Sequence, residues 1–129
     1  MTMDFFLPDD LAPRATPEET RILELRAEPY PDRVRVRVNI EITPFQTRPN
    51  VDVTLTDPDG LEVAATSLVE PMSWKLEFTL HVRGRQDPAG SYHLEARLYY
   101  PEGPEKDPVS FDFTIPAAGW GLGWAAGNV

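Results

Sequence analysis

Hydrophobic and polar residues alternate one by one in seven short segments of the chain, and proline, glycine and aspartate cluster between them. Side chains of a β-strand point alternately to its two faces, so this pattern is typical of strands with one buried face. The segments cover residues 21–28, 33–43, 51–55, 61–66, 74–82, 91–100 and 109–115. In the clearest of them, the predicted inward residues are Val34, Val36, Val38, Ile40 and Ile42. The pattern therefore predicts an all-β chain.

The first segment admits a second interpretation. Thr16-Pro17-Glu18-Glu19 has the form of a capping box, which could begin a helix that runs through residue 28. Against this, Leu23, Leu25 and Ala27 alternate with charged residues, and two prolines follow. We therefore predict a strand over residues 21–28, with these three side chains inward and at most one turn of helix before it.

Two turn sequences indicate how the strands are connected. Asp57-Pro58-Asp59-Gly60 predicts a tight hairpin, because Asp and Pro open such turns and Gly adopts positive φ. Pro88-Ala89-Gly90-Ser91-Tyr92, before the longest strand, is similar to the tyrosine corner of immunoglobulin-like domains. With Trp74 among the core aromatics, residues 20–116 resemble an immunoglobulin-like or fibronectin-III-like β-sandwich.

The resemblance implies a seven-stranded, two-sheet antiparallel sandwich. In the fibronectin-like arrangement, the first, second and fifth strands form one sheet, and the fourth, third, sixth and seventh form the other. The chain lacks cysteine, which excludes an antibody-type domain with its disulfide. A resemblance at the level of the fold brings no active site with it.

Length and charge narrow the class of protein further. A chain of 129 residues can bury one core, and we divide it into an arm (1–19), the sandwich (20–116) and a tail (117–129). Its net charge of −9 opposes binding to nucleic acid or to an anionic membrane. The sequence shows neither a signal peptide nor a membrane span, so we expect a cytoplasmic location.

Alternating strand directions bring the loops 43–50, 67–73 and 101–108 to one end of the sandwich. Phe45, Arg48 and Met72 in these loops are residue types enriched at protein interfaces. We therefore consider this end a candidate partner-binding surface. The alternative is that the arm folds back here and Phe45 closes the bottom of the core.

The tail carries no charge and places Trp120, Leu122 and Trp124 among glycines. Exposure of large apolar side chains to water is unfavourable, so we expect these three residues to bind something. Three alternatives exist for the surface that these side chains bind: the sandwich of the same chain, a second copy of the chain, or another protein. The fourth alternative is that the tail is disordered.

Four carboxylates, those of Asp32, Asp57, Asp59 and Asp87, fall in turns at the opposite end. Calcium binds six to eight oxygen ligands, so a calcium site is one interpretation. The alternative, which we favour, is that each Asp bonds the backbone of its own turn. We predict no metal and no cofactor.

Catalytic residues are not apparent in the sequence. His81 and His93 are predicted to point outward from different sheets, so they cannot share a metal or relay a proton. No serine stands in a Gly-x-Ser-x-Gly motif. Arg33, Arg35 and Arg37 form a basic stripe, which we interpret as charge-balanced by Glu24, Glu28 and Glu77 on neighbouring strands.

These observations predict a non-enzymatic protein-protein interaction module, either a small subunit or adaptor of a larger assembly or a homo-oligomer. The candidate binding residues are Phe45, Arg48, Met72, Trp120, Leu122 and Trp124. The alternative is a β-sandwich that binds a small ligand or carbohydrate. A third hypothesis, an enzyme that uses the carboxylate end, would require metal-dependent turnover.

Overall fold

Residues 13–118 are described by a computed structural model, and they contain seven β-strands with no α-helix. The strands are β1 (Ile22–Pro29), β2 (Arg35–Ile42), β3 (Asn50–Thr56), β4 (Glu62–Val69), β5 (Lys75–His81), β6 (Gly90–Tyr99) and β7 (Val109–Ile115). The all-β prediction from the alternating pattern is confirmed, and each strand overlaps its predicted segment. The outer parts of the chain, which include Trp120, Leu122 and Trp124, lie outside the described residues.

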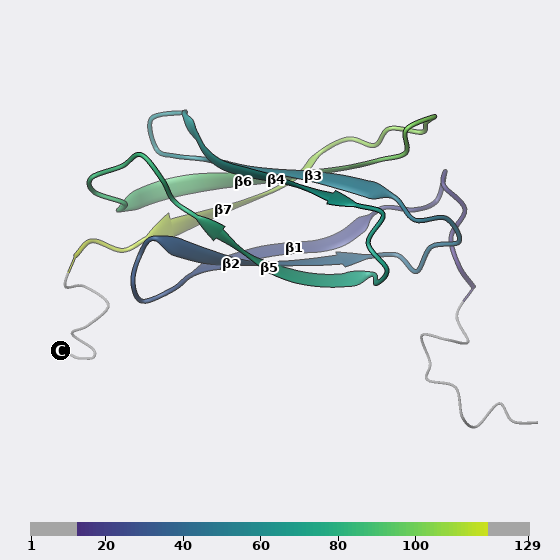
Figure 1. The fold of residues 1–129 in the computed structure, drawn as a ribbon, viewed down its shortest axis with the longest axis horizontal. Coiled ribbons are helices and arrows are strands. Elements are labelled where there is room, and N and C mark those ends of the chain that lie inside the picture. Colours follow the sequence, from purple (N-terminus) through teal and green to yellow (C-terminus); the bar gives the residue numbers. More distant parts are fainter. Residues whose placement is uncertain (1–12, 119–129) are drawn as a thin grey trace, which may run out of the picture.

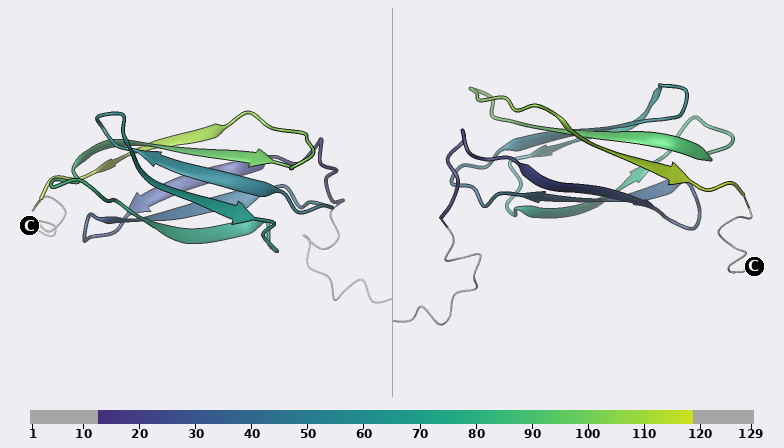
Figure 2. Two further views of the ribbon diagram at one scale, coloured as in Figure 1. Left: turned by 45° about the horizontal axis from the view of Figure 1, so that its top comes forward. Right: turned by 180° about the vertical axis from the view of Figure 1, so that it is seen from behind.

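The strands form two antiparallel sheets that pack face to face (Figure 1). One sheet has the order β1-β2-β5 and the other the order β4-β3-β6-β7. This is the arrangement predicted for a fibronectin-III-like sandwich. Figure 2 shows the two layers from two further sides, with β1 and β7 along one flank of the sandwich.

The core lies between the sheets and consists of the inward rows of the central strands. On β2, Val36, Val38 and Ile42 are fully buried and Ile40 is nearly so, as the alternation predicts. Tyr92 on β6 is 1% exposed, and its hydroxyl donates a hydrogen bond of 2.6 Å to Pro88 O. The predicted tyrosine corner therefore has the geometry that gives the motif its name.

Two predicted inward residues are exposed instead. A β-bulge adds Leu23 to β1 between Ile22 and Glu24, so Ile22 enters the core and Leu23 is 49% exposed. Val34 is 43% exposed because β2 begins only at the next residue. Arg33, which precedes it, has a φ of 68° and belongs to the turn rather than the strand.

Between residue 13, where the described part of the chain begins, and β1, the chain forms one turn and no helix. Glu19 N and Thr20 N both donate to Thr16 O, and the Glu19 side chain accepts from Thr16 N at 3.2 Å. The capping-box pattern thus folds as a single turn, and the tertiary pairing of β1 with β2 overrides the helical alternative. None of the secondary structure within residues 13–118 is a helix long and apolar enough to cross a membrane.

Candidate functional site

Three connections meet at the end of the sandwich where the arm enters, and we call residues 43–50, 69–74 and 100–108 together the loop end, with the adjoining residues of β3 and β4 included. Glu70 N donates to Asn50 Oδ1 at 2.9 Å, which joins the second connection to the first. Tyr100 donates from its hydroxyl to Thr47 O at 2.9 Å, which joins the third connection to the first. The loops therefore form one continuous surface.

Phe45 lies beneath this surface rather than on it. The ring is 6% exposed and meets Trp74 edge to face, with 6.1 Å between ring centroids. The arm covers it: Ala15 N donates to Pro44 O, and Arg14 stacks over Trp74 with its guanidinium 4.8 Å from the ring. Phe45 therefore closes the bottom of the core beneath Arg14 and Ala15 of the arm. This is the alternative interpretation from the sequence.

Met72 and Arg48 are both exposed at the loop end. Met72 is 81% exposed, and Val69, three residues before it at the end of β4, is 70% exposed. Val69 was not among the predicted binding residues, because the predicted strand ended at residue 66. The continued alternation through 67–69, in which Val69 takes an outward position, is the signal that could have found it. Two large apolar side chains and one arginine thus stand in solvent on the loop end.

At the opposite end, Asp57 and Asp59 bind an arginine that sequence analysis did not single out. Arg85 Nη1 lies 2.7 Å from Asp57 Oδ2 and 3.0 Å from Asp59 Oδ2. Asp57 Oδ1 also accepts hydrogen bonds of 2.9 Å from the N–H groups of Asp59 and Leu61. The bond from Leu61 and the contact with Arg85 hold the pKa of Asp57 below its ordinary value.

The remaining two turn carboxylates are bound in the same way. Asp32 pairs with Arg35 Nε at 2.6 Å and accepts bonds from Val34 N and Arg35 N, and these contacts lower its pKa. Asp87 accepts from Ala89 N and lies 3.3 Å from Arg33 Nη2. Backbone N–H groups and arginines therefore occupy the oxygens that calcium would need. Over residues 13–118, no three carboxylate or histidine side chains are placed to hold a metal ion.

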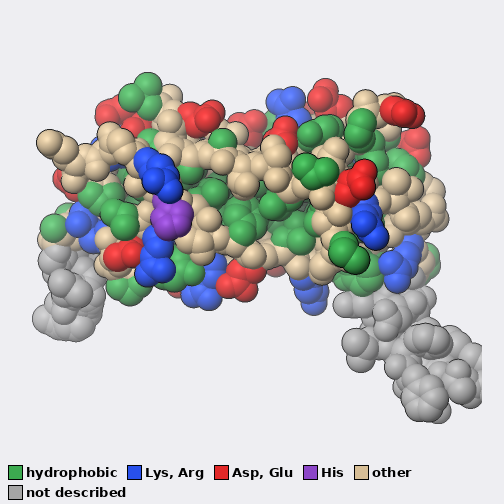
Figure 3. Space-filling model, in the orientation of Figure 1, with side chains coloured by type: hydrophobic (Ala, Val, Ile, Leu, Met, Phe, Trp, Pro, Cys, Tyr) green, Lys and Arg blue, Asp and Glu red, His purple; other side chains and the backbone are tan. Residues whose placement is uncertain are grey.

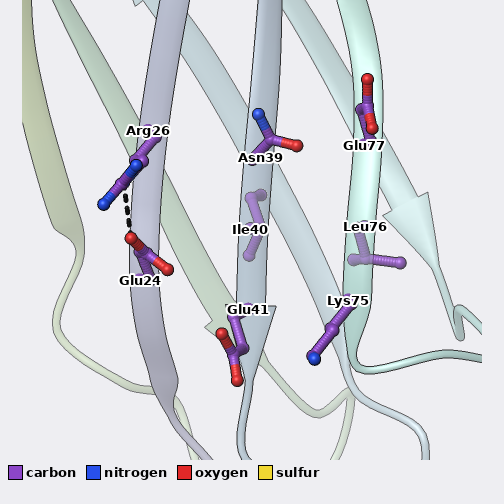
Figure 4. A pocket seen from close by; sticks show the side chains of 8 residues that line it. All are labelled: Glu24, Arg26, Asn39, Ile40, Glu41, Lys75, Leu76 and Glu77. Atoms are coloured by element: carbon purple, nitrogen blue, oxygen red, sulfur yellow. Dashed lines mark ion pairs between the residues drawn. The ribbon is translucent and has the colours of Figure 1, made fainter.

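The outer face of the β1-β2-β5 sheet carries an open polar groove of about 420 Å³ (Figure 4). Its lining side chains include Glu24, Arg26, Asn39, Glu41, Lys75 and Glu77. Glu24 pairs with Arg26 at 2.5 Å and stands opposite Glu41 in the strand register, while Lys75 stands opposite Glu41 on the other side. The amino-acid sequence alone does not indicate this groove, because its residues come together only through the register of three strands.

The predicted pairing of the basic stripe with glutamates on neighbouring strands is found for one of its three arginines, Arg37. Arg37 pairs with Glu28 at 3.6 Å and with Glu77 at 3.4 Å. Arg35 pairs with Asp32 and stacks over Tyr30, 4.4 Å from the ring centroid. Arg33 lies instead in the turn, where its Nε donates to Pro116 O at 2.8 Å. The predicted balancing role of Glu24 is wrong, because Glu24 pairs with an arginine of its own strand.

The two histidines lie on different sheets, as predicted. His81 belongs to β5 and His93 to β6. His93 Nδ1 is 2.6 Å from Asp112 Oδ1 on the exposed face of the four-stranded sheet. The two imidazoles therefore cannot act on one substrate atom.

No protein-family model matches the chain, and no curated protein matches it. Among solved structures, a Parabacteroides merdae β-glucuronidase is similar, with a TM-score of 0.54 and 12% identity over 74% of this chain and 13% of the enzyme. Chitinase ChiW of a Paenibacillus species, a cell-surface-expressed multi-modular enzyme, has a TM-score of 0.53 and 10% identity over 82% of this chain and 9% of the enzyme.

At these identities, the likeness concerns the fold. Each match involves a small part of a much larger enzyme, and this chain spans less than a sixth of either one. The strand order shows that the described part of the chain is a two-sheet antiparallel β-sandwich of seven strands, and parts of the two enzymes are similar to it in fold.

Proposed function

We propose that this chain is a non-catalytic accessory module that binds a protein partner through the loop end. The observation that carries the proposal is the exposure of Met72 (81%) and Val69 (70%) at the loop end, which also carries the exposed side chain of Arg48. Methionine adapts its shape to a partner, and arginine adds directional hydrogen bonds, which is why both are enriched at interfaces. The buried contact between Phe45 and Trp74 supports this surface from below.

The arrangement of the carboxylate and imidazole side chains supports a non-catalytic, accessory role. The carboxylates of the turns bind backbone N–H groups and arginines, and the two histidines stand apart. The similar folds also form only small parts of large enzymes, which is consistent with a non-catalytic domain. On this proposal, the chain acts as a small subunit or adaptor.

The tail residues Trp120, Leu122 and Trp124 are proposed as a second binding surface. The tail follows β7, and the last residue of β7, Ile115, pairs with Gly90 at the end opposite to the loop end. The end of β7, from which the tail continues, and the loop end therefore lie at opposite ends of the sandwich. An adaptor that joins two other proteins would make use of both.

The loop-end proposal is tested with a matched pair of variants. The double variant Val69→Asp/Met72→Asp places charge on the loop end, whereas Leu61→Asp changes a residue of similar exposure (64%) just before the other end of β4. Proteins captured from a lysate of the source organism are compared by quantitative mass spectrometry. We expect a protein that the unchanged chain and Leu61→Asp retain and the double variant loses. Equal capture by all three would contradict the proposal.

Carbohydrate binding is the second candidate, and the groove on the β1-β2-β5 sheet favours it. Its carboxylate, amide and ammonium groups are of the kind that bond sugar hydroxyls, and the similar solved structures are a β-glucuronidase and a chitinase. Titration calorimetry with chito-oligosaccharides and with glucuronic-acid oligosaccharides tests it. Binding that Asn39→Ala abolishes and Val69→Asp/Met72→Asp preserves would place the function in the groove instead of the loop end.

A further inference from the structure

Strand β5 forms one edge of its sheet, and half of its backbone groups point away from β2. Ile42 N donates to Trp74 O, and Val82 N donates to Val34 O. Antiparallel pairs alternate between bonded and non-bonded residues, so the even-numbered residues of β5 bond to β2. The N–H and C=O groups of Glu77 and Thr79 therefore face outward. Within residues 13–118, no strand pairs with this side of β5.

The other three edge strands carry features that discourage pairing with another chain. β1 contains a bulge and ends at Pro29, which has no N–H, and β1 and β7 lie along each other (Figure 2). β4 contains a bulge at Val63. β5 has no bulge, glycine or proline over its seven residues. Among the residues that the structure describes, Ser73 covers the first residue of this edge, because its hydroxyl bonds both Lys75 N and Lys75 O.

The side chains beside this edge are apolar and incompletely covered. Leu76 and Phe78 point toward the core but remain half-buried, because β4, which faces β5 across the sandwich, contributes the small inward residues Ala64 and Thr66. β4 and β5 lie nearest the viewer in Figure 1, and Figure 3 shows hydrophobic side chains along the middle of that face. The free edge therefore borders an apolar strip.

We propose that β5 pairs antiparallel with β5 of a second copy of this chain, about a two-fold axis beside Phe78. In this register, Glu77 and Thr79 of one copy form bonded pairs with Thr79 and Glu77 of the other. The alternation of the free backbone groups permits this pairing without disturbing β2. The two three-stranded sheets then join as one sheet of six strands.

In this register, the free edge of β5 is complementary to the same edge of another copy. This self-complementarity favours a second copy of the chain as the partner that pairs with β5. On the inner side, Phe78 meets Phe78, and Leu76 meets Leu80 of the second copy. On the outer side, the carboxylate of Glu77 faces the hydroxyl of Thr79, so neither carboxylates nor ammonium groups stand directly opposite their own kind. The apolar pairs extend the core across the axis and cover the half-exposed rings.

Two substitutions at one position test the pairing in the full chain. Thr79→Pro removes the outward N–H, while Thr79→Ala removes the same hydroxyl and keeps the N–H. Two symmetry-related hydrogen bonds are lost in the proline variant, so we expect its dimerisation to weaken by roughly tenfold or more relative to Thr79→Ala. Sedimentation velocity over a dilution series measures the dimer, and thermal melting verifies that both variants fold.

Amide hydrogen exchange, read residue by residue, separates a second copy from other occupants. We expect slow exchange at Glu77 and Thr79 that becomes faster on dilution in step with the loss of the dimer. Slow exchange that is independent of concentration would show that the same chain covers the edge and would overturn the proposal. A monomer at every concentration with fast exchange at both positions, or a dimer that Thr79→Pro leaves intact, would overturn it as well.

Discussion

Replacement of Tyr92 by phenylalanine tests whether the tyrosine corner stabilises the sandwich. Phenylalanine keeps the ring, which is 1% exposed and stacks on Phe113 with centroids 5.7 Å apart. The substitution removes only the hydroxyl, and with it the 2.6 Å bond to Pro88 O. Pro88 is itself buried, so water does not readily replace the lost donor. The change therefore isolates one buried hydrogen bond.

The expected loss of stability follows from the cost of an unpaired buried carbonyl. Removal of one partner of a buried hydrogen bond costs about 1–3 kcal/mol, and retention of the ring stacking places Tyr92→Phe near about 1–2 kcal/mol. For a domain of this size, that corresponds to a fall in Tm of roughly 4–8 °C. The strand order should not change, because the apolar contacts of β6 remain.

Urea unfolding monitored by tryptophan fluorescence measures the free energy of unfolding of both proteins. Tyr99→Phe is the matched control, since Tyr99 is half-exposed on the same strand, and we expect its effect to stay within about 0.5 kcal/mol. If Tyr92→Phe is as stable as the control variant, the hydrogen bond to Pro88 O has no net stabilising effect and the reasoning about the corner is refuted.

Three further predictions concern the core, one turn and the response to acid. Phe45→Ala should lower the free energy of unfolding by about 3–5 kcal/mol, because it empties a buried site, whereas Met72→Ala should change it by less than about 0.5 kcal/mol. Gly90→Ala should cost about 2 kcal/mol or more in urea unfolding, because its φ is 131° and a Cβ there would lie 2.5 Å from Pro58 Cγ. Because its pKa is lowered in the folded state, Asp57 stabilises the fold above its unfolded pKa of about 4, and this contribution is lost as pH falls through the folded pKa. Asp57→Asn should flatten that acid dependence in melts recorded across pH; an unchanged acid profile would contradict the assigned role.

The alternation of side chains is local information, and it was sufficient to predict seven strands. The sheet order was implied by the resemblance to a fibronectin-III-like sandwich, and the strand order agrees with it. The alternating pattern assigns the wrong residues to the core where the backbone departs from regular strand geometry. The bulge in β1 exchanges Leu23 for Ile22 in the core, and the positive φ of Arg33 delays the start of β2 past Val34. Neither position contains a glycine or proline that would have indicated the irregularity.

The candidate sites were predictable only in part. Turn chemistry correctly indicated that Asp32, Asp57 and Asp87 accept bonds from the backbone of their own turns. The side chain of Asp59 instead contacts Arg85, and the contact of Arg85 with Asp57 joins residues 28 positions apart. The groove depends on strand register in the same way. At the loop end, Phe45 and Met72 were both predicted to bind a partner because of their residue types. Phe45 is in fact buried against Trp74, whereas Met72 stands in solvent. Such differences arise from tertiary contacts, which the alternating pattern does not encode.

The most direct test of the central claim is the dissociation constant of the purified partner obtained by capture. It is measured by titration calorimetry against the unchanged chain, Val69→Asp/Met72→Asp and Leu61→Asp. If the loop end is the binding surface, the double variant binds at least roughly tenfold more weakly, since truncated interface anchors cost more than about 1 kcal/mol each, and Leu61→Asp binds as the unchanged chain does. Equal affinity of all three proteins for the partner would contradict the account.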